Sequence, residues 1–505
     1  MARQEFLNYV WEYCVKPQLG YAFSLNHTLP YSIIAIQEMN LATKFNPLYW
    51  SCACLCINAG STDTDFEETD DDEEDSSKKS GTPDYAKITK AISDAQLRGI
   101  KIELPDINRA EEDFIPDIEN NAILFSLRTV QAVSNDLYAQ IVAGRPYASL
   151  MDFVARIKAT QAQVVGLIKA GCFDRLEKKS RKMILRDYFT DLARTNCPPR
   201  TKLTAVQLKK PFAENRNFYQ GYEKYIRLFN FKQYIDKEQC NKALKRYELT
   251  DPYVIQYFKA AFESKMSLSK GEYSYLPGNG YIVKMSVMKK YYDKFIEPLM
   301  SYSNSFEGLQ KFNMWERDSY FKELCDKFKY NDTIASWEME QLSFYHSEHE
   351  LAHVPEAQYG IKDYNNLPEN PEQREYVKGD QVVKTVADSC LCCIAGTVVG
   401  SDNTKHIINL LTPYGVVIVK MYAEMYNRFK QKISFLEPGK KTKTVIDDSW
   451  FVRGTKLLIY GYRRENSFVA KSVKVDKYQR SVCLIEKVKP NGKLELRFTR
   501  KTTKD

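Results

Sequence analysis

The run from Ile123 to Leu176 alternates short apolar stretches with turn residues, which limits this part of the chain to a compact helical module. Four apolar residues at intervals of three predict one helix face: Leu124, Leu127, Val130 and Val133. A second helix face follows at Leu137, Ile141 and Val142. The turns are predicted where the periodicity breaks, at Gly144, Pro146 and Gly171. An ordinary helical bundle would give the same periodicity.

Four segments resemble one protein family, in the order in which that family carries them. They are GYAFSLNHTLPYSIIAIQEMNLATKFNPLYW (residues 20–50), AKITKAISDAQLRGIKIELPDINRAEEDF (86–114), the run from 123 that closes with AGCFDRL (170–176), and EMEQLSFYHSEHEL (338–351). In that order they are similar to part of the fingers, the stretch leading into PPDIN, the tandem helix-hairpin-helix and the pre-OB segment of the alpha subunit of bacterial DNA polymerase III, family C. Residues 390–475 then read like its OB-fold.

The resemblance implies a multidomain α+β fold that is mostly α-helical and ends in a β-barrel, the OB-fold. Eight segments are expected: partial fingers at 1–61, an acidic disordered linker at 62–82, the end of the fingers at 83–120, a tandem helix-hairpin-helix at 121–190, a helical connector rich in Tyr and Lys at 191–337, a pre-OB linker at 338–380, the OB-fold at 381–480 and a basic tail at 481–505. The connector departs most from the family.

A helix-hairpin-helix binds DNA by turning backbone N–H groups toward phosphate, which requires small residues at the turn. Where the family shows Gly-Val-Gly, this chain has Ala-Val-Ser, which permits close approach but resists positive φ more than glycine does. The predicted DNA contacts of this module are Ala132, Val133, Ser134, Gly171, Lys178, Lys179, Arg181 and Lys182. The last four of these lie in or next to a predicted basic helix from Lys178 to Phe189, and such a helix can instead be an ordinary solvent-exposed face.

The C-terminal part is strongly basic. Residues 381–505 contain 24 Lys and Arg against 11 Asp and Glu, and short alternating stretches between turn residues predict the strands of a small barrel. Aromatic side chains interleave with the cations, the combination with which OB-folds hold single strands. The predicted contacts are Lys420, Tyr422, Arg428, Lys430, Tyr460, Tyr462, Arg463 and Arg464. For any single aromatic residue, filling the barrel core is the alternative.

Ten acidic residues lie between Asp63 and Asp75, so the net charge of +8 understates how basic the rest of the chain is. We interpret this run as a disordered, self-repelling linker. An alternative is that the acidic strand occupies the DNA path when DNA is absent. Metal binding is disfavoured because the run lacks the glycine turn and ligand spacing of a calcium-binding loop.

Catalytic carboxylates are not predicted in this chain. Family polymerases hold two divalent metals on palm carboxylates in a motif resembling PDIDxDF, upstream of the fingers. This chain has only LPDIN, Leu104 to Asn108, which matches the later, noncatalytic segment. The chain is therefore expected to be half of a split replicative polymerase that grips duplex and single-stranded DNA, inactive alone, while an N-terminal half supplies the palm and its Mg²⁺. The alternative is a stand-alone DNA-binding accessory protein.

Two further contacts follow from the resemblance. Asn26 and His27 align with fingers residues near the incoming nucleotide, although Leu25 cannot supply a cation there. QLKKPF has the pattern of a sliding-clamp-binding peptide, with the clamp contacts predicted at Gln207, Leu208 and Phe212.

Metal binding and membrane insertion are both disfavoured. The histidines at 346, 349 and 353 and the cysteines at 390, 392 and 393 do not form two ligand pairs, so structural roles are favoured over zinc. The chain contains no run of 18 apolar residues, and its 12 cysteines are dispersed. We expect reduced thiols in the cytoplasm, the host bacterial cytoplasm if the chain is phage-encoded.

Overall fold

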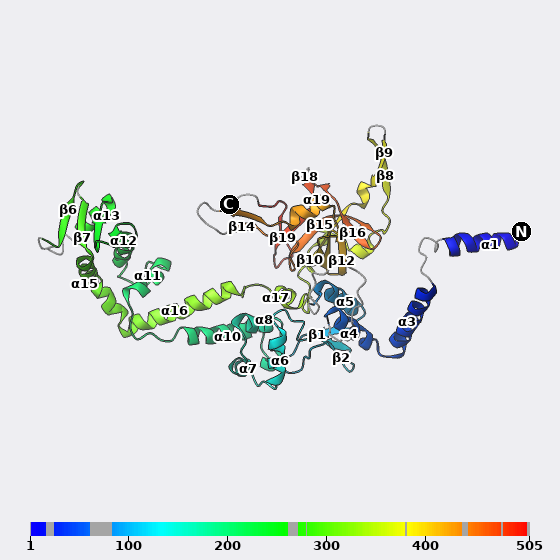
Figure 1. Ribbon diagram of the computed structural model, residues 1–505, viewed down its shortest axis with the longest axis horizontal. Helices are drawn as coiled ribbons and strands as arrows, with labels where there is room; N and C mark the ends of the chain where they lie inside the picture. Colours follow the sequence, from blue (N-terminus) through cyan, green and yellow to red (C-terminus); the bar gives the residue numbers. More distant parts are fainter. Residues whose placement is uncertain are drawn as a thin grey trace. The chain divides into compact units, whose positions relative to one another are not determined.

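Figure 1 shows the computed structural model, which describes residues 2–16, 25–60, 83–260, 271–278, 280–378, 381–436, 443–475 and 478–501. The chain divides into two compact units. Met1–Leu185 with Asp332–Asp505 form the first, called the main unit, and Arg186–Asn331 form the second, called the inserted unit. The prediction of an α+β chain with a C-terminal barrel is confirmed.

The N-terminal part of the main unit is helical. It contains α1 (Ala2–Tyr9), the π-helical η1 (Val10–Val15), α3 (Leu25–Lys44), α4 (Pro47–Asn58) and α5 (Tyr85–Leu97). Side-chain caps fix the starts of α4 and α5, because Asn46 accepts a hydrogen bond from the Leu48 N–H and Asp84 accepts one from the Lys87 N–H. The acidic run lies outside the described residues, so the disordered linker stays a prediction.

A three-stranded sheet precedes the helical module. Strands β1 (Lys101–Glu103), β2 (Ile115–Asp117) and β3 (Ala122–Leu124) pair in the order β1-β3-β2. The helix face predicted from Leu124 to Val133 is therefore wrong, because Leu124 ends a strand and pairs with Glu103. Residues 122–127 are all buried, so their apolar spacing reflects burial on every side rather than one helix face.

Short capped helices follow the sheet. They are α6 (Asn135–Ala143), α7 (Leu150–Arg156), α8 (Gln161–Lys169), α9 (Asp174–Glu177) and α10 (Arg181–Asn196). The side chains of Ser134, Ser149 and Thr160 each accept a hydrogen bond from the backbone N–H three residues on, which starts the first three helices. The prediction of short helices separated by turns is confirmed from Leu137 onward.

One buried carboxylate joins helix α17 (Ile334–Leu342) to its neighbours. Glu338 is 0% exposed, and its Oε1 accepts a hydrogen bond from Arg181 Nη1 at 2.8 Å. Its Oε2 accepts from the His346 N–H at 3.0 Å, the Ser347 N–H at 2.8 Å and the Ser347 hydroxyl at 2.6 Å. The carboxylate therefore connects α10 and α17 to the segment before the barrel.

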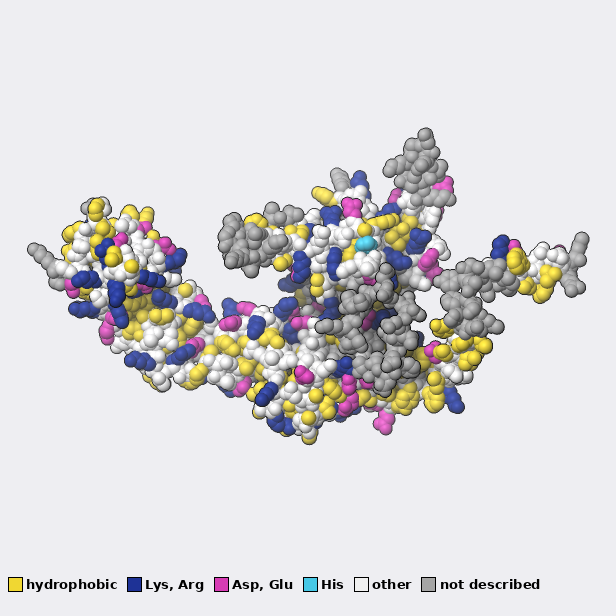
Figure 2. Space-filling view, in the orientation of Figure 1, with side chains coloured by type: hydrophobic (Ala, Val, Ile, Leu, Met, Phe, Trp, Pro, Cys, Tyr) yellow, Lys and Arg dark blue, Asp and Glu magenta, His cyan; other side chains and the backbone are white. Residues whose placement is uncertain are grey.

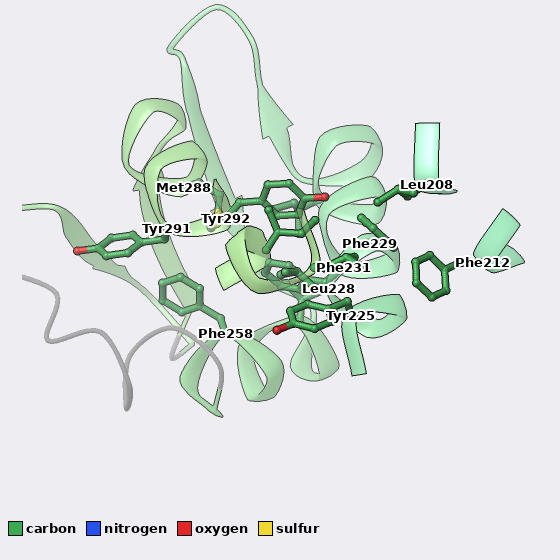
Figure 3. Close-up of a cluster of buried hydrophobic side chains, with 14 of the residues drawn as sticks. Leu208, Phe212, Tyr225, Leu228, Phe229, Phe231, Phe258, Met288, Tyr291 and Tyr292 are labelled. Atoms are coloured by element: carbon green, nitrogen blue, oxygen red, sulfur yellow. The ribbon is translucent and has the colours of Figure 1, made fainter. Parts of the chain in front are cut away.

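The inserted unit combines helices with a sheet. The helices are α11 (Ala205–Glu214), α12 (Lys224–Glu238), α13 (Pro252–Phe258), α15 (Met285–Ser303) and α16 (Phe306–Lys327). Strands β4 (Cys240–Asn241), β5 (Arg246–Leu249), β6 (Tyr273–Leu276) and β7 (Gly280–Lys284) pair in the order β4-β5-β7-β6. The helical connector predicted for 191–337 is corrected, because this unit also contains a four-stranded sheet. Strands of two to five residues are too short to show a clear period in the sequence. Figure 3 shows its aromatic core.

Five strands close the C-terminal barrel: β10 (Cys392–Asp402), β11 (Ile407–Thr412), β12 (Gly415–Lys420), β15 (Lys456–Arg464) and β16 (Ser467–Ala470). Their order is β10-β11-β12-β16-β15, and pairing of β10 with β15 completes the ring. Strands β12 and β16 are parallel, and helix α19 (Ala423–Lys430) follows β12. Strands β19 (Val482–Val488) and β20 (Leu494–Arg497) extend the sheet from β15, where a basic tail was predicted.

Smaller elements complete the main unit. Three two-stranded sheets are formed by β8 (Gln373–Lys378) with β9 (Gln381–Val386), β13 (Ile433–Leu436) with β14 (Lys443–Asp447), and β17 (Val473–Val475) with β18 (Tyr478–Arg480). The short helices are α18 (Glu356–Tyr359), η3 (Tyr364–Asn366) and η4 (Asp388–Cys390). No helix in the described part of the chain is long and apolar enough to cross a membrane.

Two arginines bind Asp447 at the end of β14. Arg497 donates two hydrogen bonds of 3.0 Å to its carboxylate, and Arg500 Nε donates one of 2.6 Å. Burial alone would raise the pKa of Asp447, but the hydrogen bonds from Arg497 and Arg500 outweigh it and lower the pKa from 3.8 to about 2.

We predict that Asp447→Asn lowers the stability of the main unit by about 2 kcal/mol at neutral pH. Because the folded-state pKa lies below the unfolded value, the stabilisation is present above pH 3.8 and is lost as the pH falls toward about 2. Thermal unfolding of both proteins across this range should show the difference shrinking with acidification. A difference that stays constant with pH would contradict this assignment.

Candidate nucleic-acid interface

The turn before helix α6 carries three of the predicted DNA contacts. Ser134 is exposed, and Ala132 and Val133 are half-buried. Ala132 lies against Gly166 of α8, where an added methyl group would overlap the alanine methyl. The turn therefore sits close to the module while the N-terminus of α6 faces solvent, a position in which unpaired N–H groups can meet a phosphate oxygen.

The turn between α8 and α9 is buried. Gly171 has φ +86°, and a Cβ there would lie 3.0 Å from Leu104 Cδ1 and 3.1 Å from Asp174 Oδ2. The Cys172 carbonyl accepts a hydrogen bond from the Ile107 N–H at 3.0 Å. The structure therefore corrects the prediction that Gly171 approaches DNA: this turn packs on the segment that contains LPDIN.

The basic cluster after α9 divides into exposed and internal cations. Arg181 is 7% exposed and binds Asp174 at 2.7 Å and Glu338 at 2.8 Å, so the prediction of a DNA contact is corrected to an internal ion pair. Lys182 is half-buried, with Nζ 5.4 Å from the centroid of the Trp337 ring. Lys178 and Lys179 are exposed and remain the cations of this cluster that face solvent.

Two predicted contacts of the barrel serve its folding instead. Tyr460 is 9% exposed and belongs to a hydrophobic cluster. The Arg463 side chain is 12% exposed, pairs with Glu369 at 2.7 Å and lies 4.7 Å over the Tyr364 ring. These contacts join β15 to the segment before β8, so neither residue is available to a nucleic acid.

Other predicted residues gather at one end of the barrel. Lys420 pairs with Val469, and Val469 pairs with Tyr462, which places Lys420 and Tyr462 in one row across three strands. Burial raises the pKa of Tyr462, with a further contribution from Tyr422 and an opposing one from Arg464, so these side chains are neighbours. Tyr422 is 70% exposed. An exposed ring beside cations is suited to stacking on a base.

Helix α19 supplies the last two predicted contacts. Arg428 is exposed, and its guanidinium carbon lies 5.6 Å from the centroid of the Phe429 ring. Lys430 is half-buried and donates a hydrogen bond from Nζ to Ser401 Oγ at 2.9 Å. Burial lowers the pKa of Lys430. Lys430 therefore reaches the end of β10 next to Asp402, which pairs with Ile407, the β11 partner of Lys420.

A groove between α5 and the barrel was not predicted. Its volume is about 1060 Å³, and it is lined by α5 and strands β10, β11 and β12. Lys87 and Lys90 of α5 face Ser401, Lys405 and Asn409 across it. Local sequence patterns could not find this groove, because its two walls lie at opposite ends of the chain.

A smaller hollow of about 320 Å³ lies between α4 and α5 and adjoins the groove. Lys87 and Lys90 line both, so the two spaces share a cationic border. Trp50, which is 36% exposed, and Arg98 also line the hollow. A cationic channel with an accessible indole ring fits a flexible polyanion that carries aromatic bases.

The clamp-peptide prediction is wrong. Residues 205–214 form helix α11, in which Gln207 completes a capping box with Thr204. Leu208 and Phe212 are 0% and 1% exposed and lie in the core of the inserted unit, as the labelled side chains in Figure 3 show. Residues needed to fill this core are not available to a sliding clamp.

The remaining sequence predictions concern nucleotide and metal contacts. Asn26 and His27 lie in the first turn of α3, but their side chains are outside the described residues, so nucleotide contact stays a prediction. His349 is held between backbone groups, since Nε2 lies 3.1 Å from the Leu411 carbonyl oxygen and Nδ1 accepts from the Leu351 N–H. Burial lowers the pKa of His349 to about 4. In the segments that the structure describes, no three His, Cys, Asp or Glu side chains converge as metal ligands.

Comparison with known proteins agrees with the resemblance in the sequence. The family model of the helix-hairpin-helix motif matches residues 99–183. The probable DNA polymerase YorL of Bacillus subtilis (strain 168) and a DNA-directed DNA polymerase of Bacillus phage SPbeta are each 37% identical over 503 residues, or 97% of this chain. The DNA polymerase III subunit alpha of Caulobacter vibrioides is 26% identical over 172 residues, which is 33% of this chain and 13% of that subunit.

The match covers only part of each relative. The chain spans 36% of the length of the Bacillus and SPbeta polymerases. A Chlamydia trachomatis DNA polymerase III subunit alpha is 30% identical over 184 residues, or 35% of this chain and 13% of that subunit.

We predict that Gly171→Ala destabilises the main unit more than Gly99→Ala. Both glycines have positive φ, +86° and +80°, so both substitutions strain the backbone by about 1 kcal/mol. At Gly171 the added Cβ also crowds its neighbours, whereas at Gly99 nothing lies within 4 Å of it. Thermal unfolding should show the larger loss for Gly171→Ala, and equal losses would contradict the buried turn.

Proposed function

We propose that this chain, a homologue of DNA polymerase III alpha subunits, is the DNA-binding C-terminal half of a replicative DNA polymerase. The helix-hairpin-helix module grips duplex DNA, and the barrel holds the unpaired template. A separate chain supplies the palm. The observation that carries this proposal is the cationic groove between α5 and the barrel, in a chain whose relatives are DNA polymerases.

The barrel wall of the groove supports single-strand binding. Five-stranded OB-folds use the face of their second and third strands for oligonucleotides, and β11 and β12 occupy those places in this barrel. Lys87, Lys90 and Lys405 can pair with successive phosphates, while Ser401 and Asn409 offer uncharged polar groups. Such contacts bind without reading sequence, which suits a template of any composition.

The turn before α6 supports the duplex grip. Ser134 is exposed at a helix N-terminus, and Lys178 and Lys179 are exposed in the same matched motif. Backbone N–H groups and lysines contact phosphates without reading bases. With Gly171 and Arg181 internal, this grip rests on the first turn and the two lysines.

Exposed apolar residues on the N-terminal helices support a protein partner. Eleven large hydrophobic side chains of α1, η1 and α3 are 48% to 67% exposed: Phe6, Leu7, Tyr9, Trp11, Leu29, Tyr31, Ile33, Ile34, Ile36, Met39 and Leu41. Figure 2 shows hydrophobic side chains along these helices. Exposed apolar surface of this extent marks interaction sites. The palm-bearing chain, which would hold the Mg²⁺ ions of the reaction, is the partner we assign to it.

A stand-alone accessory protein is the second candidate function. It would use the same groove and the same helix-hairpin-helix module. The exposed apolar side chains of α3 favour the polymerase half, because an accessory protein that works alone would leave them in water.

We predict that Lys87→Ala with Lys90→Ala weakens binding of single-stranded DNA and lowers its salt dependence. Loss of two phosphate contacts should reduce the slope of log K against log salt by about 1.4. Fluorescence anisotropy over a range of salt concentrations measures this slope. The matched control, Lys487→Ala with Lys489→Ala, removes two lysines of the same unit outside the groove and should leave the slope nearly unchanged. Equal slopes for the two pairs would overturn the groove.

We predict that Ile33→Asp with Ile36→Asp prevents copurification with the palm-bearing chain encoded in the same genome and abolishes primer extension by the pair. Both side chains are about half exposed on α3, so the substitutions place charge in the partner interface without disturbing a core. DNA binding by this chain alone should persist. Gln37→Asp with Asn40→Asp adds the same charge at exposed polar positions of α3 and is the control.

If the wild-type chain does not copurify with a palm-bearing chain, the accessory function replaces the polymerase half.

A further inference from the structure

The inserted unit contains an open hollow between helices α12 and α13. Its volume is about 320 Å³, and most of its lining is aromatic. Phe231 and Tyr234 contribute from α12, and Tyr253 and Tyr257 from α13. None of these residues was assigned a role by the sequence motifs or by the matched helix-hairpin-helix region.

Two tyrosines form the open sides of the hollow. Tyr253 is 82% exposed and Tyr234 is 42% exposed. Phe231 and Tyr257 form a packed pair deeper in the unit, with ring centroids 4.7 Å apart. Exposing a large aromatic ring to water on each side of a hollow is unfavourable. A flat apolar group that enters between or beside the two rings removes this cost.

The two sides are held in place before any ligand arrives. Tyr234 donates a hydrogen bond from its hydroxyl to Asp251 Oδ2 at 3.3 Å. The other oxygen of Asp251 accepts from the Tyr253 N–H at 2.8 Å and the Val254 N–H at 3.2 Å, which caps α13. One carboxylate therefore fixes the spacing between the two aromatic walls. Such preorganisation lowers the entropic cost of binding.

The inserted unit as a whole has an excess of cations, while Asp251, the charged residue that lines the hollow, has its carboxylate oxygens occupied by the hydrogen bonds to Tyr234, Tyr253 and Val254. The inserted unit contains 26 Lys and Arg against 17 Asp and Glu. Arg227 lies one turn before Asn230, which lines the hollow, and its charge acts on Tyr257. Lys259, just after α13, is exposed. Figure 2 shows basic side chains over the visible face of this unit, at the left of the view.

We infer that the inserted unit is a second binding site for single-stranded DNA, in which an unpaired base stacks against Tyr253 and Tyr234. Asn230 can hydrogen-bond the edge of the base, and Arg227 can pair with a flanking phosphate. Duplex DNA does not fit this chemistry, because its base faces are covered by stacking. The site is additional to the barrel groove and lies in a different unit.

Photocrosslinking locates the stacked base. Oligothymidylate of about 20 nucleotides, longer than one barrel covers, carries a single 5-iodouracil that bonds to an aromatic ring stacked on it. Irradiation with the full chain and mass spectrometry of the peptides should give adducts at Tyr253 or Tyr234. Adducts in the barrel alone overturn the second site and leave the groove proposal standing. Adducts in the inserted unit alone support the second site and overturn the groove proposal.

Affinity measurements test the stacking itself. In the Lys87→Ala, Lys90→Ala background the groove is weakened, so binding through the inserted unit dominates. There, Tyr253→Ala should weaken oligothymidylate binding between about 5- and 100-fold, whereas Tyr253→Phe, which keeps the ring face, should bind nearly as well as the background. Phe306→Ala removes an aromatic side chain that is 84% exposed in the same unit but outside the hollow, and it should have no effect. Equal affinities for Tyr253→Ala and Phe306→Ala overturn the inference and leave the hollow to a protein ligand.

Discussion

The main unit depends on a buried carboxylate. Glu338 binds the Arg181 guanidinium with one oxygen and three donors of the His346–Ser347 segment with the other. A buried charge is tolerated when it is paired and hydrogen-bonded, and here the partners come from the helical module and from the chain entering the barrel. Thr89 of α5 adds a hydrogen bond to the Ser343 carbonyl nearby, so α5 is positioned by the same segment. The position of the groove wall follows from these contacts.

Local signals in the sequence were sufficient for part of this fold. The turn residues Gly144 and Gly171 and the alternation in the barrel strands depend on neighbours a few residues away, and short helices and the barrel were predicted from them. The strand at Leu124 was misread as a helix, because a stretch buried on every side has no polar face to reveal its period. Arg181 looked like its neighbours Lys178 and Lys182 in sequence, and its buried ion pair with Glu338, 157 residues away, could not be read from local spacing.

The candidate site was less predictable than the fold for the same reason. Tyr460 and Tyr462 lie two residues apart and therefore on the same side of β15, yet Tyr460 is 9% exposed within a hydrophobic cluster and Tyr462 is half-buried. Composition alone could not predict this difference. The groove was missed entirely, because Lys87 and Lys405 are ordinary surface lysines until α5 packs beside the barrel. The hollow of the inserted unit was hidden in a segment whose many tyrosines and phenylalanines mostly fill a core.

The closeness of α5 to β10 has a consequence for when the proposed single-strand groove forms. An added methyl group at Gly400 would overlap the methyl of Ala86, so two backbones that are 314 residues apart in sequence meet here. Contacts of such high sequence separation carry a large loop-closure entropy and form late in folding. A nascent or partly unfolded chain can therefore possess intact helices and an intact barrel and still lack the groove between α5 and the barrel. Binding of single-stranded DNA in this groove would then require that the chain has completed its folding.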